Sequence, residues 1–489
     1  MYRRRDGQMT VEDFILPFSG ELRQDNRWVK LAGIVPWEAF EEKYASLFGE
    51  VGNPAKPARM ALGALLIQAK LKTTDEETVL QISENVYLQY FIGQKEYQTK
   101  PPFDPSMMVF FRKRITTSML EWINEEIRKK QDSLSSETPQ APPGGGAGST
   151  NADVDTSAAN RGQLILDATC APQDIRYPTD IQLLNEAREL LEGMIDQLWE
   201  QANAGGKKPR TYRKMARWDF LRFIKRRKPS KQKIRSAIRA QLGYVRRDLQ
   251  IVDQLLMELG IDSLTDAQVE KLITIHRLYD QQQQMYATKT HHAADRIVSI
   301  SQPYVRPIVR GKAGQETEFG AKILVSMVNG HATIERLSWD NFNESVDLKE
   351  SIEAYRVRYG FYPAVVLADK LFRNRANLAF CKKHGIRLSG LPLGRPKISD
   401  APIVKRTELD DNARRNAIEG KFGQGKRRYG LARIMTKLKH TSEVSIHMQF
   451  LVMNLEHCLR ALFSFFTEGS VLGGILQFPT SHIACFFFS

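Results

Sequence analysis

Two short apolar runs that each end in an aspartate constrain the fold of this chain most strongly. Residues 164–166 precede Asp167, and residues 364–368 precede Asp369. Both runs are β-rich, short and bounded by chain breakers, as buried strands are. An ionisable group at the tip of a core strand is costly unless it is paired or binds a metal ion. We therefore expect both aspartates to belong to a charged site.

A third carboxylate stands among cations in residues 411–429. If this stretch is helical, Arg415, Glu419 and Lys426 share one face, and Phe422 lies close to the same stripe. Such a face suits a site where the cations hold a phosphodiester and the carboxylate holds a metal ion. The alternative is an exposed helix whose Arg–Glu and Glu–Lys pairs contribute roughly 0.2–0.5 kcal/mol each.

Three converging carboxylates predict a particular chemistry. They can hold two divalent ions roughly 3.5 to 4 Å apart, which activate a water or a 3′-hydroxyl and stabilise the leaving oxygen of a phosphodiester. The residues by themselves therefore indicate a metal-dependent enzyme that acts on nucleic acid.

These residues resemble insertion-sequence transposases with an Asp-Asp-Glu nuclease core, in particular the IS-five group of the wider IS-four-like set. The similarity includes Asp-Ala-Thr at 167–169, Tyr-Pro-Thr-Asp at 177–180, and Asp369 within Ala-Asp-Lys-Leu-Phe-Arg-Asn-Arg. It also includes the spacing Arg415, three residues, Glu419, six residues, Lys426. The family signature opens with a Tyr three positions before the Arg, where this chain has Asn412.

The resemblance implies an α/β fold: a ribonuclease-H-like (retroviral-integrase-like) nuclease core with an N-terminal all-helical domain and a basic helical insertion. It implies that Asp167, Asp369 and Glu419 are catalytic and bind Mg²⁺, for which Mn²⁺ can substitute. The implied partner is double-stranded DNA, both element ends and target, held by a homodimer or higher oligomer. The candidate DNA-binding residues are Arg415, Lys426, Arg427, Arg428, Arg226, Arg227, Lys228, Arg112, Lys113 and Arg114.

The charge and cysteine content agree with such a partner. Lys and Arg outnumber Asp and Glu by 71 to 56, a net charge of +15, which suits a polyanion. The four cysteines lie far apart, which predicts neither a zinc site nor a disulfide framework. No apolar run is long enough to span a membrane, so we expect a cytoplasmic protein. The resemblance further implies a nucleoid-associated protein of a prokaryotic cell.

Composition divides the chain into segments. Residues 1–130 are predicted to form the helical DNA-binding domain, and residues 131–162, rich in Ser, Thr, Pro, Gly and Ala, a flexible linker. Residues 163–467 are predicted to form the catalytic domain, with a helical insertion at about 179–290. Residues 468–489 form a tail for which the sequence suggests no role.

The insertion is the most basic part of the chain. Residues 207–247 contain 17 lysines and arginines against one acid, Asp219, with aromatic residues between them. A basic helix with aromatics can also bind calmodulin or a membrane, but beside a nuclease core it favours a track for DNA.

After the insertion, residues 319–337 read as a hairpin around the turn Asn329-Gly330. The predicted order strand, hairpin, helix, strand, helix, strand, helix is that of a ribonuclease-H-like core. Trp339 follows the hairpin and can either stack on a displaced base or pack in the core or a lid.

The sequence thus predicts a transposase that binds the terminal repeats of its element, cleaves there and joins the 3′-hydroxyl ends to target DNA. The alternatives are a ribonuclease-H-like nuclease without strand transfer and a catalytically silent DNA-binding protein of transposase descent.

Overall fold

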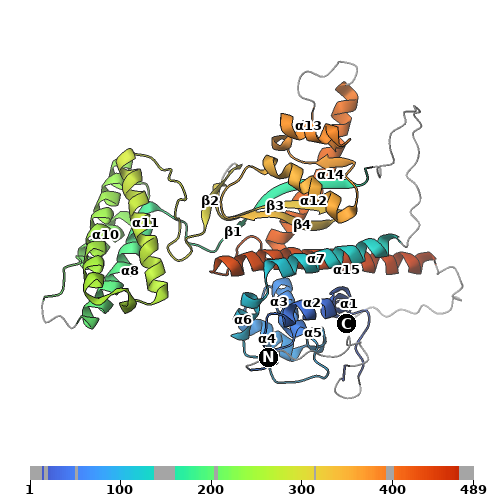
Figure 1. Ribbon diagram of the computed structural model, residues 1–489, viewed down its shortest axis with the longest axis horizontal. Helices are drawn as coiled ribbons and strands as arrows, with labels where there is room; N and C mark the ends of the chain where they lie inside the picture. The colour runs from blue at the N-terminus through green and yellow to red at the C-terminus, as the bar shows by residue number, and fades with distance from the viewer. Residues whose placement is uncertain are drawn as a thin grey trace, which may run out of the picture. The chain divides into compact units, whose positions relative to one another are not determined.

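The structure, a computed structural model, describes residues 14–15, 20–49, 53–136, 160–202, 207–312, 315–391 and 401–472 (Figure 1). The chain forms two compact units. The first comprises residues 1–153, 330–332 and 448–489, and the second comprises residues 154–329 and 333–447.

The first unit is helical, as the sequence predicts. Its helices are α1 (Arg27–Ile34), α2 (Trp37–Ala45), α3 (Ala58–Leu71), α4 (Asp75–Glu84), α5 (Val86–Phe91), α6 (Met107–Arg114), α7 (Thr117–Ser136) and the part of α15 (Lys439–Leu472) that follows residue 447. The side chains of Asn26, Thr74 and Asn85 cap α1, α4 and α5 by accepting hydrogen bonds from first-turn N–H groups.

Aromatic side chains fill the core of this unit. The rings of Trp28 and Trp37 pack edge-on against Phe91, with centroids 5.1 and 5.4 Å away. Helix α7 continues to Ser136, so residues 131–136 are helical although the composition places them in the linker. Residues 137–159 of the predicted linker and 473–489 of the predicted tail lie outside the described residues.

The second unit contains a six-stranded sheet of β1 (Gln163–Pro172), β2 (Arg306–Lys312), β3 (Gln315–Val328), β4 (His331–Ser338), β5 (Val365–Leu367) and β6 (Arg387–Leu388). The strand order is β2-β3-β1-β5-β6, and β4 also pairs with β3. Strand β1 is antiparallel to β3 and parallel to β5, which is parallel to β6.

The predicted hairpin is confirmed. Asn329 and Gly330 have φ angles of 50° and 80°, as a type I′ turn requires. Strands β1 and β3 approach so closely that a Cβ on Gly320 would lie 2.1 Å from the carbonyl oxygen of Ala171. The sequence analysis missed β2, because arginines and Pro307 interrupt its apolar pattern; proline is tolerated on an edge strand such as this one.

Helices cover the sheet. A cluster of buried side chains from α12 (Leu348–Tyr359) and α13 (Arg375–Lys383) packs against Leu164 and Leu166 of β1. Since side chains alternate across a strand, Asp167 belongs to the opposite face of β1 from these leucines. Helix α14 (Ala401–Arg428) contacts both β1 and β5.

The insertion has its own core. It consists of α8 (Asp180–Gln201), α9 (Arg213–Ile224), α10 (Lys231–Leu259) and α11 (Asp266–Thr288), and the apolar cluster lies among α8, α10 and α11. Thr179 and Ser230 cap α8 and α10, and Thr265 forms a capping box with Gln268 at the start of α11.

Candidate active site

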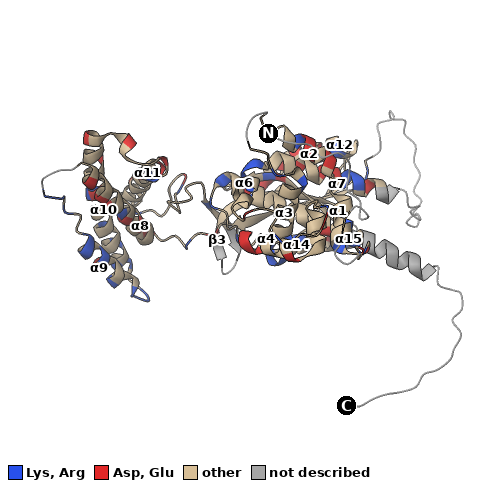
Figure 2. Cartoon of the chain, turned by 90° about the horizontal axis from the view of Figure 1, so that it is seen from below, with Lys and Arg blue, Asp and Glu red and all other residues tan. Residues whose placement is uncertain are grey.

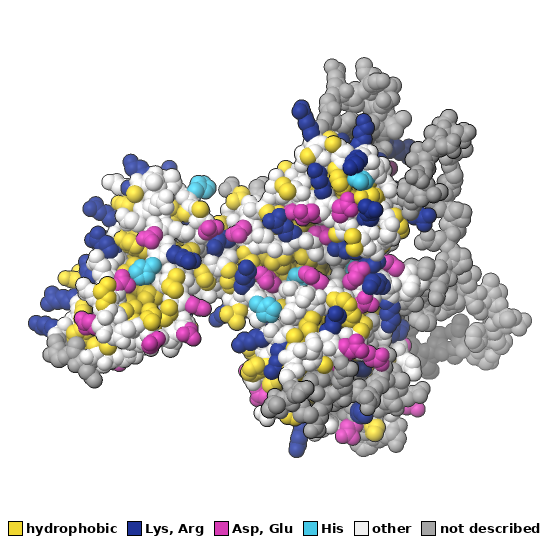
Figure 3. Space-filling model, viewed as in Figure 1, with side chains coloured by type: hydrophobic (Ala, Val, Ile, Leu, Met, Phe, Trp, Pro, Cys, Tyr) yellow, Lys and Arg dark blue, Asp and Glu magenta, His cyan; other side chains and the backbone are white. Residues whose placement is uncertain are grey.

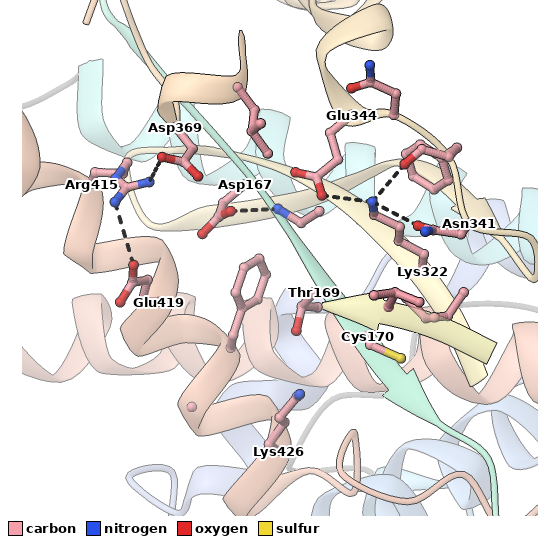
Figure 4. A pocket seen from close by; sticks show the side chains of 18 residues that line it. Asp167, Thr169, Cys170, Lys322, Asn341, Glu344, Asp369, Arg415, Glu419 and Lys426 are labelled. Atoms are coloured by element: carbon pink, nitrogen blue, oxygen red, sulfur yellow. Dashed lines mark hydrogen bonds and ion pairs between the residues drawn. The ribbon is translucent and has the colours of Figure 1, made fainter. Parts of the chain in front are cut away.

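The three predicted catalytic carboxylates line one pocket of about 760 Å³ in the second unit (Figure 4). Asp167 comes from β1, Asp369 lies two residues beyond the end of β5, where it caps a short 3-10 helix (Lys370–Phe372), and Glu419 comes from α14. We call this pocket the carboxylate pocket. Other residues that the argument uses from its wall are Lys322, Glu344, Arg415, Phe422 and Lys426.

The sheet places the two aspartates together. The parallel register pairs Ile165 with Leu367, and two further positions along each chain lead to Asp167 and Asp369. Strand β5 ends at Leu367, whereas β1 continues to Pro172 against β3. The sequence analysis placed Asp167 at the tip of its strand, which is wrong: Asp167 is mid-strand, and only its β5 partner has ended.

Helix α14 supplies the glutamate because its apolar side chains fix one of its faces. Ile418 and Phe422 are buried, whereas the side chain of Glu419 is 56% exposed. Helix α14 includes this stretch, as the spacing predicts. Gly420 lies within the helix, and a Cβ added there would contact no other atom.

Arg415 lies between two of the carboxylates. Its guanidinium nitrogens are 3.5 Å from Asp369 Oδ1 and 3.9 Å from Glu419 Oε1 (Figure 4). The first distance is at the limit of a hydrogen bond and the second is beyond it, and among the described residues the buried Nε of Arg415 has no hydrogen-bond partner. Within those residues no three acidic, His or Cys side chains are grouped as metal ligands.

Asp167 is the most perturbed member of the site. Burial raises its pKa to about 6; a hydrogen bond from the Ala168 N–H and the charge of Arg415 oppose the shift, and Glu344 and Glu419 add to it. Burial is the main cause of the raised pKa, because a desolvated carboxylate loses the hydration that stabilises its charge. Such a group gains from a bound cation.

Lys322 and Glu344 are pocket residues that the sequence analysis missed. Lys322 Nζ lies 2.9 Å from Glu344 Oε1 and donates to the Phe342 carbonyl at 2.7 Å and to Asn341 Oδ1 at 3.3 Å. These three acceptors use all three donors of the ammonium group. Neither residue belongs to a motif. They come together because β4 pairs with β3, which carries Lys322, and then leads into the segment that contains Glu344.

The DNA-binding candidates have different surroundings. Lys426 faces Glu318 at 3.8 Å, and Arg427 and Arg428 are exposed in the last turn of α14. In the N-terminal unit, Arg112 makes two hydrogen bonds to Asp75, at 2.8 and 2.6 Å. The guanidinium of Arg114 lies over the Phe48 ring, and Lys113 is exposed.

In the insertion, Arg226, Arg227 and Lys228 are exposed in the turn between α9 and α10. Figure 2 shows lysines and arginines gathered on α9, and Figure 3 shows basic side chains projecting from the insertion. These three residues are therefore accessible to a polyanion.

Trp339 is buried rather than exposed to a possible ligand. It is 5% exposed, its Nε1 donates to Glu443 at 2.9 Å, and its ring meets Tyr304 edge-on at 4.5 Å. Its ring faces are not open to a base in this conformation, so the packing alternative fits the structure.

None of the described helices combines the length and the apolar character needed to cross a membrane. No solved structure matches the chain.

Two families of known proteins match this chain, one in its N-terminal part and one in its C-terminal part. Residues 366–456, which include Asp369 and Glu419, match the family described as "Transposase DDE domain". Residues 17–114 match the family described as "Transposase domain (DUF772)". The chain is also 31% identical over 163 residues to "Uncharacterized protein ORF8 in nfe locus" of Rhizobium meliloti, an alignment that covers 33% of this chain and 70% of that protein. The IS-five group stays a prediction, but the chain belongs to the insertion-sequence DDE transposases.

Proposed function

We propose that this transposase binds the terminal repeats of its insertion sequence, cleaves phosphodiester bonds at the element ends and joins the 3′-hydroxyls to target DNA. The observation that carries the proposal is the carboxylate pocket, which Asp167, Asp369 and Glu419 all line although they lie far apart in the sequence. Structural carboxylates do not need to share one open wall, whereas a site for phosphodiester chemistry does.

The sheet supports a ribonuclease-H-like core. From β1 to α14 the elements follow the predicted order strand, hairpin, helix, strand, helix, strand, helix, with the insertion and β2 added after β1. The order β4-β3-β1-β5-β6, antiparallel from β3 to β1 and parallel from β1 to β6, agrees with that fold. This order places Asp167 on the central strand β1 and Asp369 just after β5, the strand next to it.

The donor set fits divalent cations. Carboxylate oxygens are the ligands that Mg²⁺ and Mn²⁺ prefer, and a bound cation would offset the burial that raises the pKa of Asp167. Asp167, Asp369 and Glu419 would hold the ions. Bound ions of this kind lower the pKa of a water or 3′-hydroxyl and stabilise the leaving oxygen.

The cations on the same wall have a complementary task. Arg415 and Lys426 lie on the face of α14 that carries Glu419, and both line the pocket. A guanidinium held only by long ion pairs can turn to a phosphodiester and grip it in a bidentate manner. Arg415 and Lys426 would thus position the scissile phosphate against the carboxylates.

Two successive displacements account for the reaction. In cleavage, water attacks phosphorus, the P–O3′ bond breaks, and the strand leaves as a 3′-hydroxyl and a 5′-phosphate. In joining, that 3′-hydroxyl attacks a target phosphodiester, forms the new P–O3′ bond and releases a target 3′-hydroxyl. The number of phosphodiester bonds is unchanged in the second step, so joining needs no external energy source.

The test is an incubation of the full chain with labelled DNA that carries the inverted repeats flanking its gene, with Mg²⁺, with Mn²⁺ and with Ca²⁺. We expect nicking at the repeat ends and joined products with a target plasmid. Nicking without joined products would indicate a nuclease, and repeat binding without nicking would indicate a silent DNA-binding protein. Either result contradicts the proposal.

A further inference from the structure

The insertion carries charges of opposite sign at its two ends. Residues 213–225, which form α9 and its C-terminal cap, contain five lysines and arginines against one acid, Asp219. Residues 254–270, which join the end of α10 to the start of α11, contain four acids and no lysine or arginine. In Figure 2 the blue of Lys and Arg covers α9, whereas the red of Asp and Glu lies toward the other end of α10 and α11. The carboxylate pocket does not explain this division.

The exposed side of α9 is both cationic and apolar. Ala216 is buried and Asp219 accepts a hydrogen bond from the Tyr244 hydroxyl at 3.0 Å, so the side of α9 that carries them faces α10. Trp218 is instead 54% exposed, and the guanidinium of Arg222 lies 4.6 Å from its ring centre. We call the exposed side the basic face. Its residues, spaced three and four apart, are Lys214, Arg217, Trp218, Leu221, Arg222 and Lys225.

The far end of the insertion is acidic and apolar. Met257 is 86% exposed, and Ile261, one helical turn further along the chain, is exposed as well. Large apolar side chains exposed next to each other indicate an interaction surface, and Met is enriched in protein interfaces. We call this surface the acidic end. Its residues are Met257, Glu258, Ile261, Asp262, Asp266 and Glu270, all exposed.

The basic face and the acidic end of one copy cannot meet. Helix α9 runs beside the first half of α10, where Gln241 Nε2 donates to the Ala216 carbonyl at 3.4 Å, whereas the acidic end begins in the last turn of α10. Gln241 and Leu259 lie about 27 Å apart along this continuous helix, at about 1.5 Å per residue. Among the described residues, no cation of the basic face and no acid of the acidic end forms an ion pair. Both surfaces can therefore bind another molecule.

Their complementarity favours a second copy of this chain as that molecule. Each surface sets two large apolar side chains among charges of one sign, and the two signs are opposite. Duplex DNA would pair with the cations, but its contacts are mainly to phosphates, which leave Trp218 and Leu221 without an apolar partner. Duplex DNA is also repelled by the acidic end. The acidic end of a second copy supplies carboxylates for the cations and Met257 and Ile261 for the apolar side chains.

We propose that two copies of this chain associate through their insertions, with the basic face of each copy against the acidic end of the other. In an antiparallel pair of insertions the contact occurs twice around a twofold axis. The repeat doubles the buried area toward the roughly 1,200–2,000 Å² of specific, stable interfaces. Arg226, Arg227 and Lys228 lie outside the basic face and stay available to DNA. The interface goes beyond the proposed function and does not depend on the carboxylate pocket.

The test measures the mass of the full chain in solution without DNA, by sedimentation velocity at rising micromolar concentrations. We expect an equilibrium between monomer and dimer that salt shifts toward the monomer, because salt screens exposed charges. One variant, Lys214→Glu with Arg217→Glu, reverses charges of the basic face. A second variant, Glu258→Lys with Glu270→Lys, reverses charges of the acidic end. Each should weaken its own dimer about a hundredfold, since like charges then face each other in both contacts.

Mixing the two reversed variants is the decisive measurement. In a mixed pair the reversed basic face meets the reversed acidic end, and the two unchanged surfaces also meet, so a heterodimer should form with about the parent affinity. Met257→Ser, which keeps every charge, should weaken the dimer about tenfold. The matched control, Lys382→Glu with Lys383→Glu, reverses two exposed cations of α13 and should leave the dimer unchanged. Each variant is first compared with the parent chain in thermal unfolding.

The outcomes are distinct. A parent chain that stays monomeric at every concentration would overturn the proposal, and so would a dimer that persists in both reversed variants. A mixture of the two variants that stays monomeric would also overturn it. If the parent chain is monomeric and reversal of the basic face lowers its affinity for duplex DNA, that face binds DNA and not a second copy. Nicking of repeat DNA is measured separately, so this interface and the proposed function can each fail alone.

Discussion

The carboxylate pocket and the basic insertion differ in how they arrange charge. In the carboxylate pocket, acids and cations alternate: Arg415 lies between Asp369 and Glu419, and Lys322 is held by Glu344. Residues 207–247 of the insertion instead contain 17 lysines and arginines against one acid, and Arg226, Arg227 and Lys228 are exposed between α9 and α10. The first arrangement can hold cations and phosphate together and so suits chemistry, whereas the second attracts a polyanion and suits binding.

The largest expected effect comes from removing a carboxylate charge. Three variants test this: Glu419→Gln, Asp167→Asn and Asp369→Asn. Each removes a charge that would hold the ions but keeps the side-chain shape. Nicking should therefore fall by about three orders of magnitude or more, while repeat binding persists. Rates are measured with Mg²⁺ and affinities with Ca²⁺. Lys426→Ala is the control: it should weaken binding and reduce nicking only in part, with recovery at low salt. Near-normal nicking by Glu419→Gln would show that Glu419 is not one of the metal ligands.

A buried acid in the insertion provides the next prediction. Asp248 is fully buried, and among the described residues neither of its carboxylate oxygens has a hydrogen-bond partner. Burial and then Glu192 raise its pKa to about 7, against the opposing charges of Arg188, Arg247 and Arg213. The folded state therefore holds a proton that the unfolded chain releases.

The sign of the pH dependence follows. Because the folded-state pKa is raised, the contribution of Asp248 to the free energy of unfolding is full below about pH 4. It is lost as the pH rises to about 7. Asp248→Asn should remove that loss and make the insertion more stable at neutral pH by a few kcal/mol, at about 1.4 kcal/mol per pKa unit. Hydrogen exchange of α8 and α10 in both proteins across this pH range measures it. Parallel stability curves for the two proteins would show that Asp248 does not titrate there.

Charge removal in the turn between α9 and α10 should act on binding alone. Replacing Arg226, Arg227 and Lys228 by Ala should weaken duplex binding about tenfold to a hundredfold and flatten the plot of log K against log salt, by about 0.9 per lost phosphate contact. The matched control replaces Lys382 and Lys383, exposed in the last turn of α13. If the slope of log K against log salt is unchanged in the variant that lacks Arg226, Arg227 and Lys228, the insertion does not contact the DNA.

The smallest effect distinguishes two neighbouring cations in the N-terminal unit. Arg112→Ala breaks the ion pair with Asp75, whose two side chains are 16% and 28% exposed, and should cost about 1 kcal/mol of stability. Lys113→Ala should leave stability unchanged and weaken DNA binding slightly. Urea unfolding and duplex titration of both variants measure this difference. A loss of DNA affinity with Arg112→Ala at unchanged stability would restore Arg112 as a phosphate contact.

Much of the fold was predictable because local signals mark it. Apolar periodicity indicated helices such as α3 and α8, and Asn329-Gly330 indicated the hairpin. Strand β2 was not predictable from its own residues, because its stability comes from pairing with β3 rather than from an apolar pattern. The true extent of β1 was hidden for the same reason: beyond Asp167 it is held by β3, which lies far away in the sequence.

The site was predictable only where residue spacing is local. Arg415, Glu419 and Lys426 share a helix, so their common face could be read directly. The side-by-side position of Asp167 and Asp369 depends on a parallel register that the sequence does not state. The contact between Glu344 and Lys322 depends on tertiary structure and had no signal in the sequence.

The measurement that tests the separation of chemistry from binding most directly compares two variants on the same terminal-repeat DNA. For Glu419→Gln and for the combined Arg226, Arg227 and Lys228 replacement, it determines both the Kd in Ca²⁺ and the nicking rate in Mg²⁺ at saturating protein. We predict that the first variant keeps the parent Kd and loses the rate, whereas the second loses affinity and keeps the saturated rate. If both variants change the same quantity, the carboxylate pocket and the insertion do not have separate tasks.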